Sequence, residues 1–204
     1  HVEGMEDAEH EHADHEHADE DDDGHGVEIE YDEHIWTSPV NAMAIVKIIN
    51  QTLDEALPGE AGRFDENTRA YLGELEELDG EFRQVVAQGK RHMIIVADKF
   101  PFRYFADEYG LSYRAAFSGC SSDTEPSART IAYLIDKIKA EQIPVVYYLE
   151  LSSHSTARVI GEETGAKPML LHSCHNVTRR EFDQGITYLQ LMKRNVEALR
   201  AGLS

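Results

Sequence analysis

The sequence has no lysine or arginine in its first 33 residues, although this stretch carries 16 aspartate and glutamate side chains. The other 171 residues contain 23 acidic and 19 basic side chains, so most of the formal net charge of −20 belongs to the N-terminal segment. Because no basic patch is present to neutralise phosphate groups, we do not expect a nucleic acid partner. An acidic segment that is also rich in histidine favours cations instead.

Long apolar runs are also missing. No stretch approaches the roughly 20 apolar residues that a membrane-spanning helix requires. The chain begins with HVEGMEDAEH, which lacks both the basic and the apolar region of a signal peptide. It starts without methionine and inside a His/Asp/Glu tract, so we expect a fragment of a longer protein. Neither a phosphate-binding loop nor a nucleophile–base pair stands out, which argues against catalysis.

Residues 1–30 almost lack large apolar side chains, so burial cannot offset the entropy cost of ordering this segment. We therefore interpret it as a disordered arm. Its histidines are separated by acidic residues, whereas an engineered tag would have consecutive histidines. Such an arm offers many weak, exchangeable sites and is dispensable for the fold. The predicted role is zinc capture by His10, His12, His15, His17 and His25.

Two helical patterns follow the arm. From Pro39 onward, apolar residues recur at helical spacing until the sequence PGE at 58–60. A second pattern covers residues 64–89 and would span on the order of 35–40 Å. This length is more typical of a brace between two lobes than of a helix inside one small domain.

After Gly89, short apolar runs alternate with helical patterns. The predicted strands cover residues 92–98, 111–119, 144–151 and 167–173, and the predicted helices cover 101–110, 125–143, 152–165 and 178–203. This alternation predicts an α/β fold with a four-stranded parallel sheet flanked by helices. Ligands of such sheets bind beyond the carboxyl ends of the strands. Those ends carry Asp98, Lys99, Cys120, Glu150, His172, Cys174 and His175.

Four segments match, in chain order, the motifs of a known family. DEHIWTSPVNA (32–42) resembles an Asp-Pro-His-hydrophobic-Trp signature that ends in Pro-x-Asn-Ala, and KFPFRYFADEYGL (99–111) resembles a His-x-Ala-Phe-x-Tyr-Phe segment. DTEPSARTIAYLIDKIKAEQIPVVYYLEL (123–151) resembles a helix that starts with Glu-Pro-Ser, followed by a strand that ends in Glu. TGAKPMLLHS (164–173) resembles a strand that ends in a metal-ligating Asp. The family is that of the substrate-binding proteins of bacterial zinc and manganese ABC importers, which include lipoproteins and adhesins.

The resemblance implies how the chain is organised. In that family one long rigid helix joins two α/β lobes, and the metal lies between them. This chain would then contain a histidine-rich loop at 1–30, a remnant of the N-terminal lobe at 31–63, the connector helix at 64–89 and the C-terminal lobe at 90–204. Most of the N-terminal lobe, with one expected histidine ligand, would lie outside the chain.

The resemblance also implies a ligand set. His34 matches the histidine of the tryptophan signature. The next ligand position falls on Lys99, whose protonated amine cannot bind a metal, so Asp98 is the alternative there. The final Asp position falls on His172, and His175 follows within three residues. Imidazoles favour Zn²⁺ whereas Mn²⁺ prefers oxygen ligands, so we expect zinc, with manganese as the alternative.

Three kinds of residue at the strand ends keep open roles. Glu150 either accepts bonds from backbone N–H groups or orients a ligand histidine, and it ranks low as a ligand itself. Cys120 and Cys174 form a disulfide, which is the default in an exported protein, or remain free thiols. Direct ligation by Cys174 is the least favoured interpretation. Lys99 pairs with Glu150 or Asp98 in the simplest interpretation.

Two functions fit this pattern. The favoured one is an extracytoplasmic receptor that captures a divalent transition metal, zinc above all, and delivers it to the permease of an ABC importer. Such a receptor would meet the membrane only through a lipid anchor that this chain does not contain. The alternative is a zinc-dependent hydrolase of α/β fold, with the three histidines at 34, 172 and 175 as ligands and Glu150 as general base. Nothing in the sequence is specific to adhesion.

Overall fold

The computed structural model describes residues 32–117 and 126–204. Within them, four short strands form one parallel sheet in the order β2-β1-β3-β4. The strands are β1 (Met93–Val96), β2 (Ser112–Ala115), β3 (Val145–Tyr148) and β4 (Lys167–Leu170). The predicted four-stranded parallel sheet is therefore confirmed. Because β2 and β3 lie on opposite sides of β1, the strand order reverses between β1 and β3, where ligands of such sheets bind.

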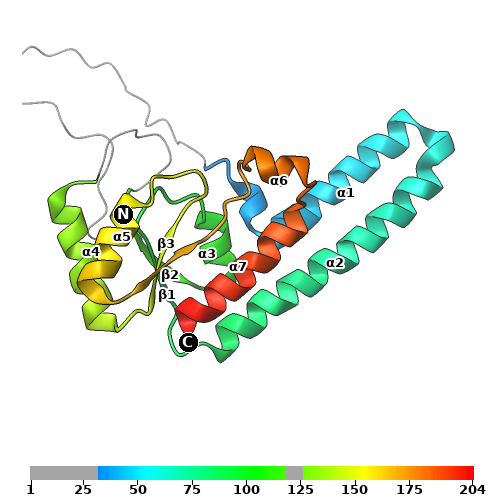
Figure 1. Ribbon diagram of the computed structural model, residues 1–204. Helices are drawn as coiled ribbons and strands as arrows, with labels where there is room; N and C mark the ends of the chain where they lie inside the picture. Colours follow the sequence, from blue (N-terminus) through cyan, green and yellow to red (C-terminus); the bar gives the residue numbers. More distant parts are fainter. Residues whose placement is uncertain (1–31, 118–125) are drawn as a thin grey trace, which may run out of the picture.

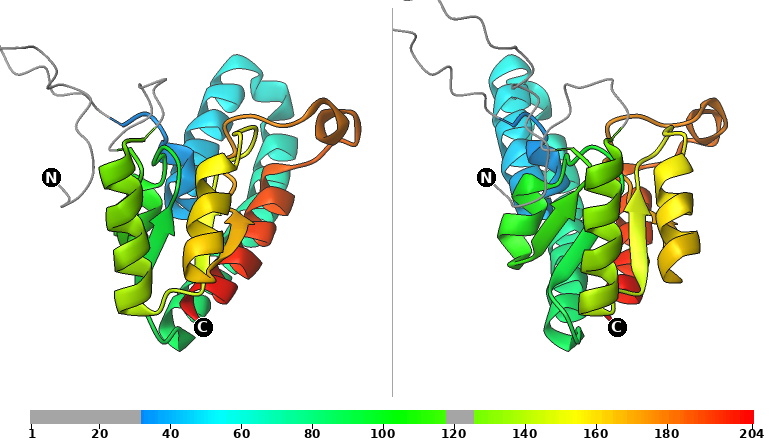
Figure 2. Two further views of the ribbon diagram at one scale, coloured as in Figure 1. Left: turned by 60° about the vertical axis from the view of Figure 1, so that its left-hand side comes forward. Right: turned by 90° about the vertical axis from the view of Figure 1, so that its left-hand side faces the viewer.

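Helices cover both faces of the sheet (Figure 1, Figure 2). Their bounds are α2 (Ala61–Gln88), α3 (Arg103–Tyr109), α4 (Ala128–Glu141), α5 (Ser155–Thr164), α6 (Arg179–Asp183) and α7 (Tyr188–Leu203). Side chains of α4 and α5 pack on the face that carries Ile95 and Val146. Side chains of α2, α3 and α7 pack on the opposite face, where Val96 and Tyr147 are fully buried. Burial on both faces explains why the strands are continuous apolar runs.

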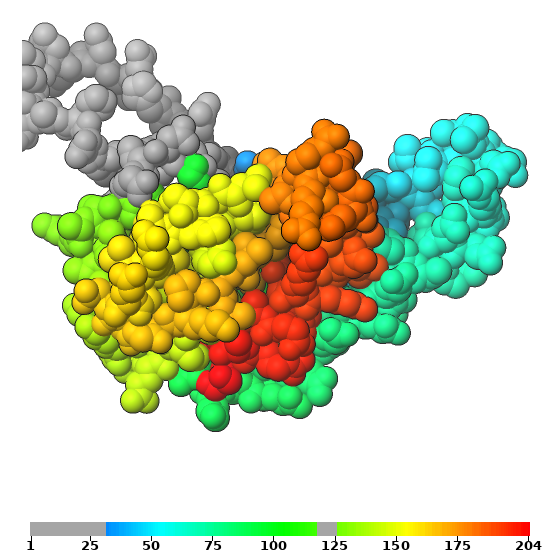
Figure 3. All heavy atoms as spheres, in the orientation of Figure 1, coloured from blue at the N-terminus to red at the C-terminus, as the bar shows by residue number. Residues whose placement is uncertain are grey.

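α1 (Pro39–Ala56) and the first half of α2 form an antiparallel hairpin that projects from the sheet and its helices (Figure 1, Figure 3). α1 begins after Ser38, whose side chain accepts a hydrogen bond from the backbone N–H of Asn41. A short turn, η2 (Pro58–Glu60), joins the two helices. The second half of α2 enters the core through four side chains that are at most 3% exposed: Leu75, Leu78, Phe82 and Val85.

The length of α2 agrees with the long helix expected at 64–89. Its 28 residues give a length of about 42 Å, and it begins three residues earlier than predicted. Its role as a connector between two lobes stays a prediction, as do the four chain segments built around it. In the described part of the chain, no helix is both long and apolar enough to cross a membrane.

The prediction of one continuous helix at 178–203 is wrong. The structure has two helices, α6 and α7, and Gly185 between them adopts a left-handed conformation with φ of 67°. Thr178 and Thr187 each begin one of these helices with a capping box. These side chains bond the first N–H groups of each helix, so the helical backbone bonds stop and restart here.

Candidate metal site

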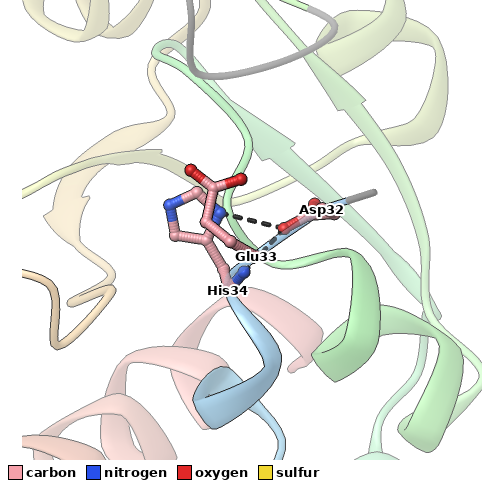
Figure 4. Close-up of side chains that lie close together, drawn as sticks. All are labelled: Asp32, Glu33 and His34. Atoms are coloured by element: carbon pink, nitrogen blue, oxygen red, sulfur yellow. Dashed lines mark hydrogen bonds and ion pairs between the residues drawn. The ribbon is translucent and has the colours of Figure 1, made fainter. Parts of the chain in front are cut away.

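His34 lies just before a 3-10 turn, η1 (Ile35–Thr37), and is only 5% exposed. Its backbone N–H donates to Asp32 Oδ1 at 2.9 Å, and its ring Nδ1 lies at the same distance from that oxygen (Figure 4). Because a carboxylate only accepts, Nδ1 carries the proton of the neutral ring and Nε2 keeps its lone pair. A carboxylate that orients the ring in this way is typical of metal-binding histidines.

Glu33 is exposed and places a second carboxylate next to His34 (Figure 4). Ligand atoms of Asp32, Glu33 and His34 lie within 4.8 Å of one another. In residues 32–117 and 126–204, this is the one group of three or more histidine, cysteine or acidic side chains that meets this distance. The ligand set expected from the sequence omitted both carboxylates, although their position beside the histidine of the tryptophan signature was a usable signal.

Three hydrogen bonds tie the segment around His34 to other parts of the fold. The Tyr104 hydroxyl in α3 donates to the carbonyl oxygen of Asp32 at 2.8 Å. The Trp36 indole N–H donates to the carbonyl oxygen of residue 173, in the loop after β4, at 3.0 Å. The Tyr188 hydroxyl in α7 donates to the carbonyl oxygen of Trp36 at 2.7 Å. The segment is thereby held beside the loop that carries the other candidate histidines.

His175 is the candidate that the structure brings close to His34. Its ring centroid lies 5.7 Å from that of His34 and 5.9 Å from that of Trp36. Trp36 also contacts His34, with the ring centroids 5.3 Å apart. His175 is exposed and His34 is buried, so the pair lies at the surface end of a buried site.

His172 is placed differently. It is 2% exposed, and its Nδ1 accepts a hydrogen bond from the backbone N–H of Cys174 at 2.9 Å. Nε2 therefore carries the proton of the neutral ring, and this buried atom has no hydrogen-bond partner among the described residues. Burial lowers the pKa of His172, while the nearby Glu150 opposes that shift. A role as ligand stays a prediction, and it requires the ring to give up its bond to Cys174.

Glu150 organises the loop that carries these histidines. Its carboxylate accepts hydrogen bonds from the backbone N–H of Ser173 at 2.9 Å, from the Ser173 hydroxyl, and from the backbone N–H of His175 at 3.3 Å. One of its oxygens also lies 3.7 Å from Nδ1 of His172. The arrangement corresponds to the first expected role, a carboxylate bonded to backbone N–H groups. Its lower-ranked role as a ligand stays a prediction.

Asp98 connects the ends of two neighbouring strands. One carboxylate oxygen accepts from the backbone N–H of Lys99 at 2.9 Å, and the other accepts from the backbone N–H of Leu149 at 3.3 Å. Both oxygens thus stabilise the backbone at the point where β1 and β3 end. Ligation by Asp98 and an ion pair of Lys99 with either acid remain predictions.

Cys174 is a half-buried free thiol that packs against the core beside α7. Burial, together with the negative charge of Glu150, raises the pKa of this thiol to about 12. Its expected disulfide partner, Cys120, lies outside the described residues, so the disulfide stays a prediction. The five arm histidines expected to capture zinc, and the expected disorder of residues 1–30, also lie outside the described part.

Comparison with known sequences places this site in a family. The family described as zinc-uptake complex component A, periplasmic, matches residues 1–202. The zinc-binding lipoprotein AdcA of Streptococcus pneumoniae (strain ATCC BAA-255 / R6) is 33% identical over 184 residues, which cover 89% of this chain and 36% of that protein. The high-affinity zinc uptake system protein ZnuA of Bacillus subtilis (strain 168) is 32% identical over 172 residues, which cover 84% of this chain and 53% of that protein. The chain thus spans about a third to a half of the length of these relatives.

Solved structures share the fold. The Zn(II)-bound ZnuA-like domain of Streptococcus pneumoniae AdcA superposes with a TM-score of 0.72 at 31% identity, covering 85% of this chain and 64% of that one. The metal-dependent lipoprotein YcdH of Bacillus subtilis gives a TM-score of 0.74 at 32% identity, covering 84% of this chain and 64% of that one. The α/β architecture is therefore common to this chain and to proteins that carry metal.

Proposed function

Because this chain belongs to the family of periplasmic component A proteins of zinc-uptake complexes, we propose that it is the zinc-holding part of an extracytoplasmic receptor. The receptor captures the ion and delivers it to the permease of an ABC importer. Zinc is cargo in this role, so the site must bind it and later release it. Attachment to the membrane would come from a lipid anchor on the protein to which this chain belongs.

The approach of His34 and His175 is the observation that carries the proposal. The two residues come from distant parts of the sequence, yet their ring centroids are 5.7 Å apart. Asp32 fixes the His34 ring so that Nε2 presents a lone pair. Two neutral imidazoles are ligands that Zn²⁺ accepts readily, whereas Mn²⁺ favours oxygen ligands. The pair therefore favours zinc over the manganese alternative.

Glu33 supplies a carboxylate ligand in this proposal. It stands where the signature that this segment resembles has proline, and its carboxylate lies in the same 4.8 Å group as the His34 ligand atom. Lys99 occupies the position where the resembled family has a ligand, and a protonated amine has no lone pair to offer. A carboxylate at position 33 compensates for that loss, because zinc accepts mixed nitrogen and oxygen ligands.

The hydrolase alternative is weaker on two grounds. Family membership favours a receptor. In addition, Glu150, the expected general base, already accepts hydrogen bonds from two backbone N–H groups and one hydroxyl. A base committed in this way is poorly placed to activate a metal-bound water.

Zinc titration by calorimetry tests the proposal. The background is the 204-residue chain with its arm histidines, at positions 1, 10, 12, 15, 17 and 25, replaced by asparagine, so that only the folded site is measured. We expect one tight site whose dissociation constant rises by roughly 100-fold in His34→Ala and in His175→Ala, because a ligand is lost. Glu33→Gln should weaken binding by about 10-fold.

The control for this titration is His92→Ala, which removes an exposed histidine at the opposite end of β1. It should bind zinc as the parent does. His172→Asn keeps an acceptor for the Cys174 N–H and separates the remaining candidate ligand from the pair. If His34→Ala and His175→Ala bind zinc as tightly as His92→Ala, the proposed site is wrong.

A further inference from the structure

We propose that three aromatic side chains, Trp36, Tyr104 and Tyr188, act as positioning residues that hold His34 opposite His175. We refer to these three residues as the aromatic latch. This inference rests on the proposed zinc function, because it explains how the two ligands of that site are kept at their spacing. None of the three side chains needs to touch the metal.

The latch fixes both ends of the segment that carries His34. Tyr104, from α3, holds the carbonyl oxygen of Asp32 on one side of the histidine, and Tyr188, from α7, holds the carbonyl oxygen of Trp36 on the other. Hydrogen bonds inside the segment are local, such as those of the Ile35 and Thr37 N–H groups to oxygens two and three residues earlier. They shape the turn but do not connect it to the helices and the loop around it.

Trp36 connects the two ligand-bearing segments directly. Its indole N–H donates to the carbonyl oxygen of Ser173 at 3.0 Å, two residues before His175. Its ring also contacts both histidines, at centroid distances of 5.3 Å to His34 and 5.9 Å to His175. One side chain thus sets both the hydrogen-bond link and the van der Waals spacing between the rings.

The physical effect of the latch is preorganisation. A segment held in its metal-binding geometry before zinc arrives does not pay an ordering cost when zinc binds. Removing one latch hydrogen bond should shift that cost onto the binding step. Given the net value of one hydrogen bond, the zinc dissociation constant should rise by roughly 2- to 10-fold for each bond removed.

The test compares Trp36→Phe, Tyr104→Phe and Tyr188→Phe in the same arm-histidine background as above. Each variant keeps an aromatic ring and loses a single donor. The control is Tyr133→Phe, which removes a tyrosine hydroxyl that accepts from Arg114 between α4 and β2. Three quantities are measured: the zinc dissociation constant, the visible absorption spectrum of bound Co²⁺, and the urea midpoint of the metal-free protein.

The expected result is weaker zinc binding and an altered Co²⁺ spectrum in all three latch variants, with both unchanged in Tyr133→Phe. The spectrum reports ligand geometry, which a purely structural contribution to stability would leave alone. Trp36 is the single tryptophan in the sequence, so its emission gives an independent binding signal in the two tyrosine variants.

Two failures are distinguishable. If the parent binds zinc through His34 and the latch variants match Tyr133→Phe in affinity and spectrum, the latch is wrong and the proposed function stands. If neither the parent nor the variants show binding that depends on His34, the proposed function itself is wrong, and the latch with it.

Discussion

Single residues carry large consequences where a polar atom is fully buried, and Tyr147 is the clearest case. Its side chain is inaccessible to solvent, and its hydroxyl donates to the carbonyl oxygen of Ala198 in α7 at 2.9 Å. Burial raises the pKa of this phenol above its ordinary value. The folded protein therefore holds the neutral form at a pH where an unfolded chain would ionise.

The stability of the protein should accordingly fall at alkaline pH. Because the folded pKa of Tyr147 is raised, its contribution is fully present below the unfolded value near 10 and is lost as the pH rises above it. This one tyrosine should cost about 1.4 kcal/mol of unfolding free energy between pH 8 and pH 11. Urea denaturation at both pH values should show a smaller loss for Tyr147→Phe than for the parent. Equal losses would contradict the assignment.

The same approach at Ala198 shapes the packing of a whole element. α7 begins with the capping box at Thr187, and its buried face packs over the sheet. Near its end, Gly202 faces the hydroxyl of Tyr147, and a Cβ atom at this position would collide with that oxygen. Gly80 in α2 is also helical, but a Cβ there would meet nothing within 4 Å.

Two matched glycine substitutions test this packing of α7. Gly202→Ala should destabilise the protein by about 1–3 kcal/mol, because the helix or the tyrosine must move. Gly80→Ala should leave stability unchanged or raise it by up to about 1 kcal/mol, because alanine favours the helix. Thermal and urea unfolding of both variants measure the difference. A Gly202→Ala protein as stable as the parent would show that α7 does not lie this close to β3.

At the scale of the whole molecule, charge divides the chain into two parts. The first 33 residues carry 16 of the 39 acidic side chains and no basic ones, whereas the remainder is nearly balanced. The folded part has its own core on both faces of the sheet. The charged arm has too few apolar residues to add to that core.

Deletion of residues 1–31 should therefore leave the thermal midpoint of the metal-free protein unchanged. The number of weakly bound zinc ions should fall, because the arm histidines and carboxylates are removed, while the tight site keeps its affinity. Calorimetric zinc titration and thermal unfolding of both proteins measure these effects. A lower midpoint after deletion would mean that the arm packs on the fold, contrary to its composition.

Local patterns in the sequence were enough to predict the architecture. Each strand is a short apolar run and each is followed by a helical pattern, so the parallel sheet and its helical layers follow from chain order alone. The exception was the break between α6 and α7, where apolar spacing continues through Gly185 and only the capping bonds of Thr187 reveal a second start. His34 was predictable because its signature is local.

Tertiary structure decided which side chains meet. Sequence spacing cannot distinguish His172 from His175, because both follow the same strand within three residues. The loop turns at Cys174, which has a positive φ of 59°, so that His172 points into the core and His175 lies beside His34. The bonds that commit Glu150 and Asp98 to backbone N–H groups, and the latch formed by three distant aromatic residues, likewise depend on the packing of separate elements. Periodicity records which face of one element is buried, and it contains nothing about contacts between elements.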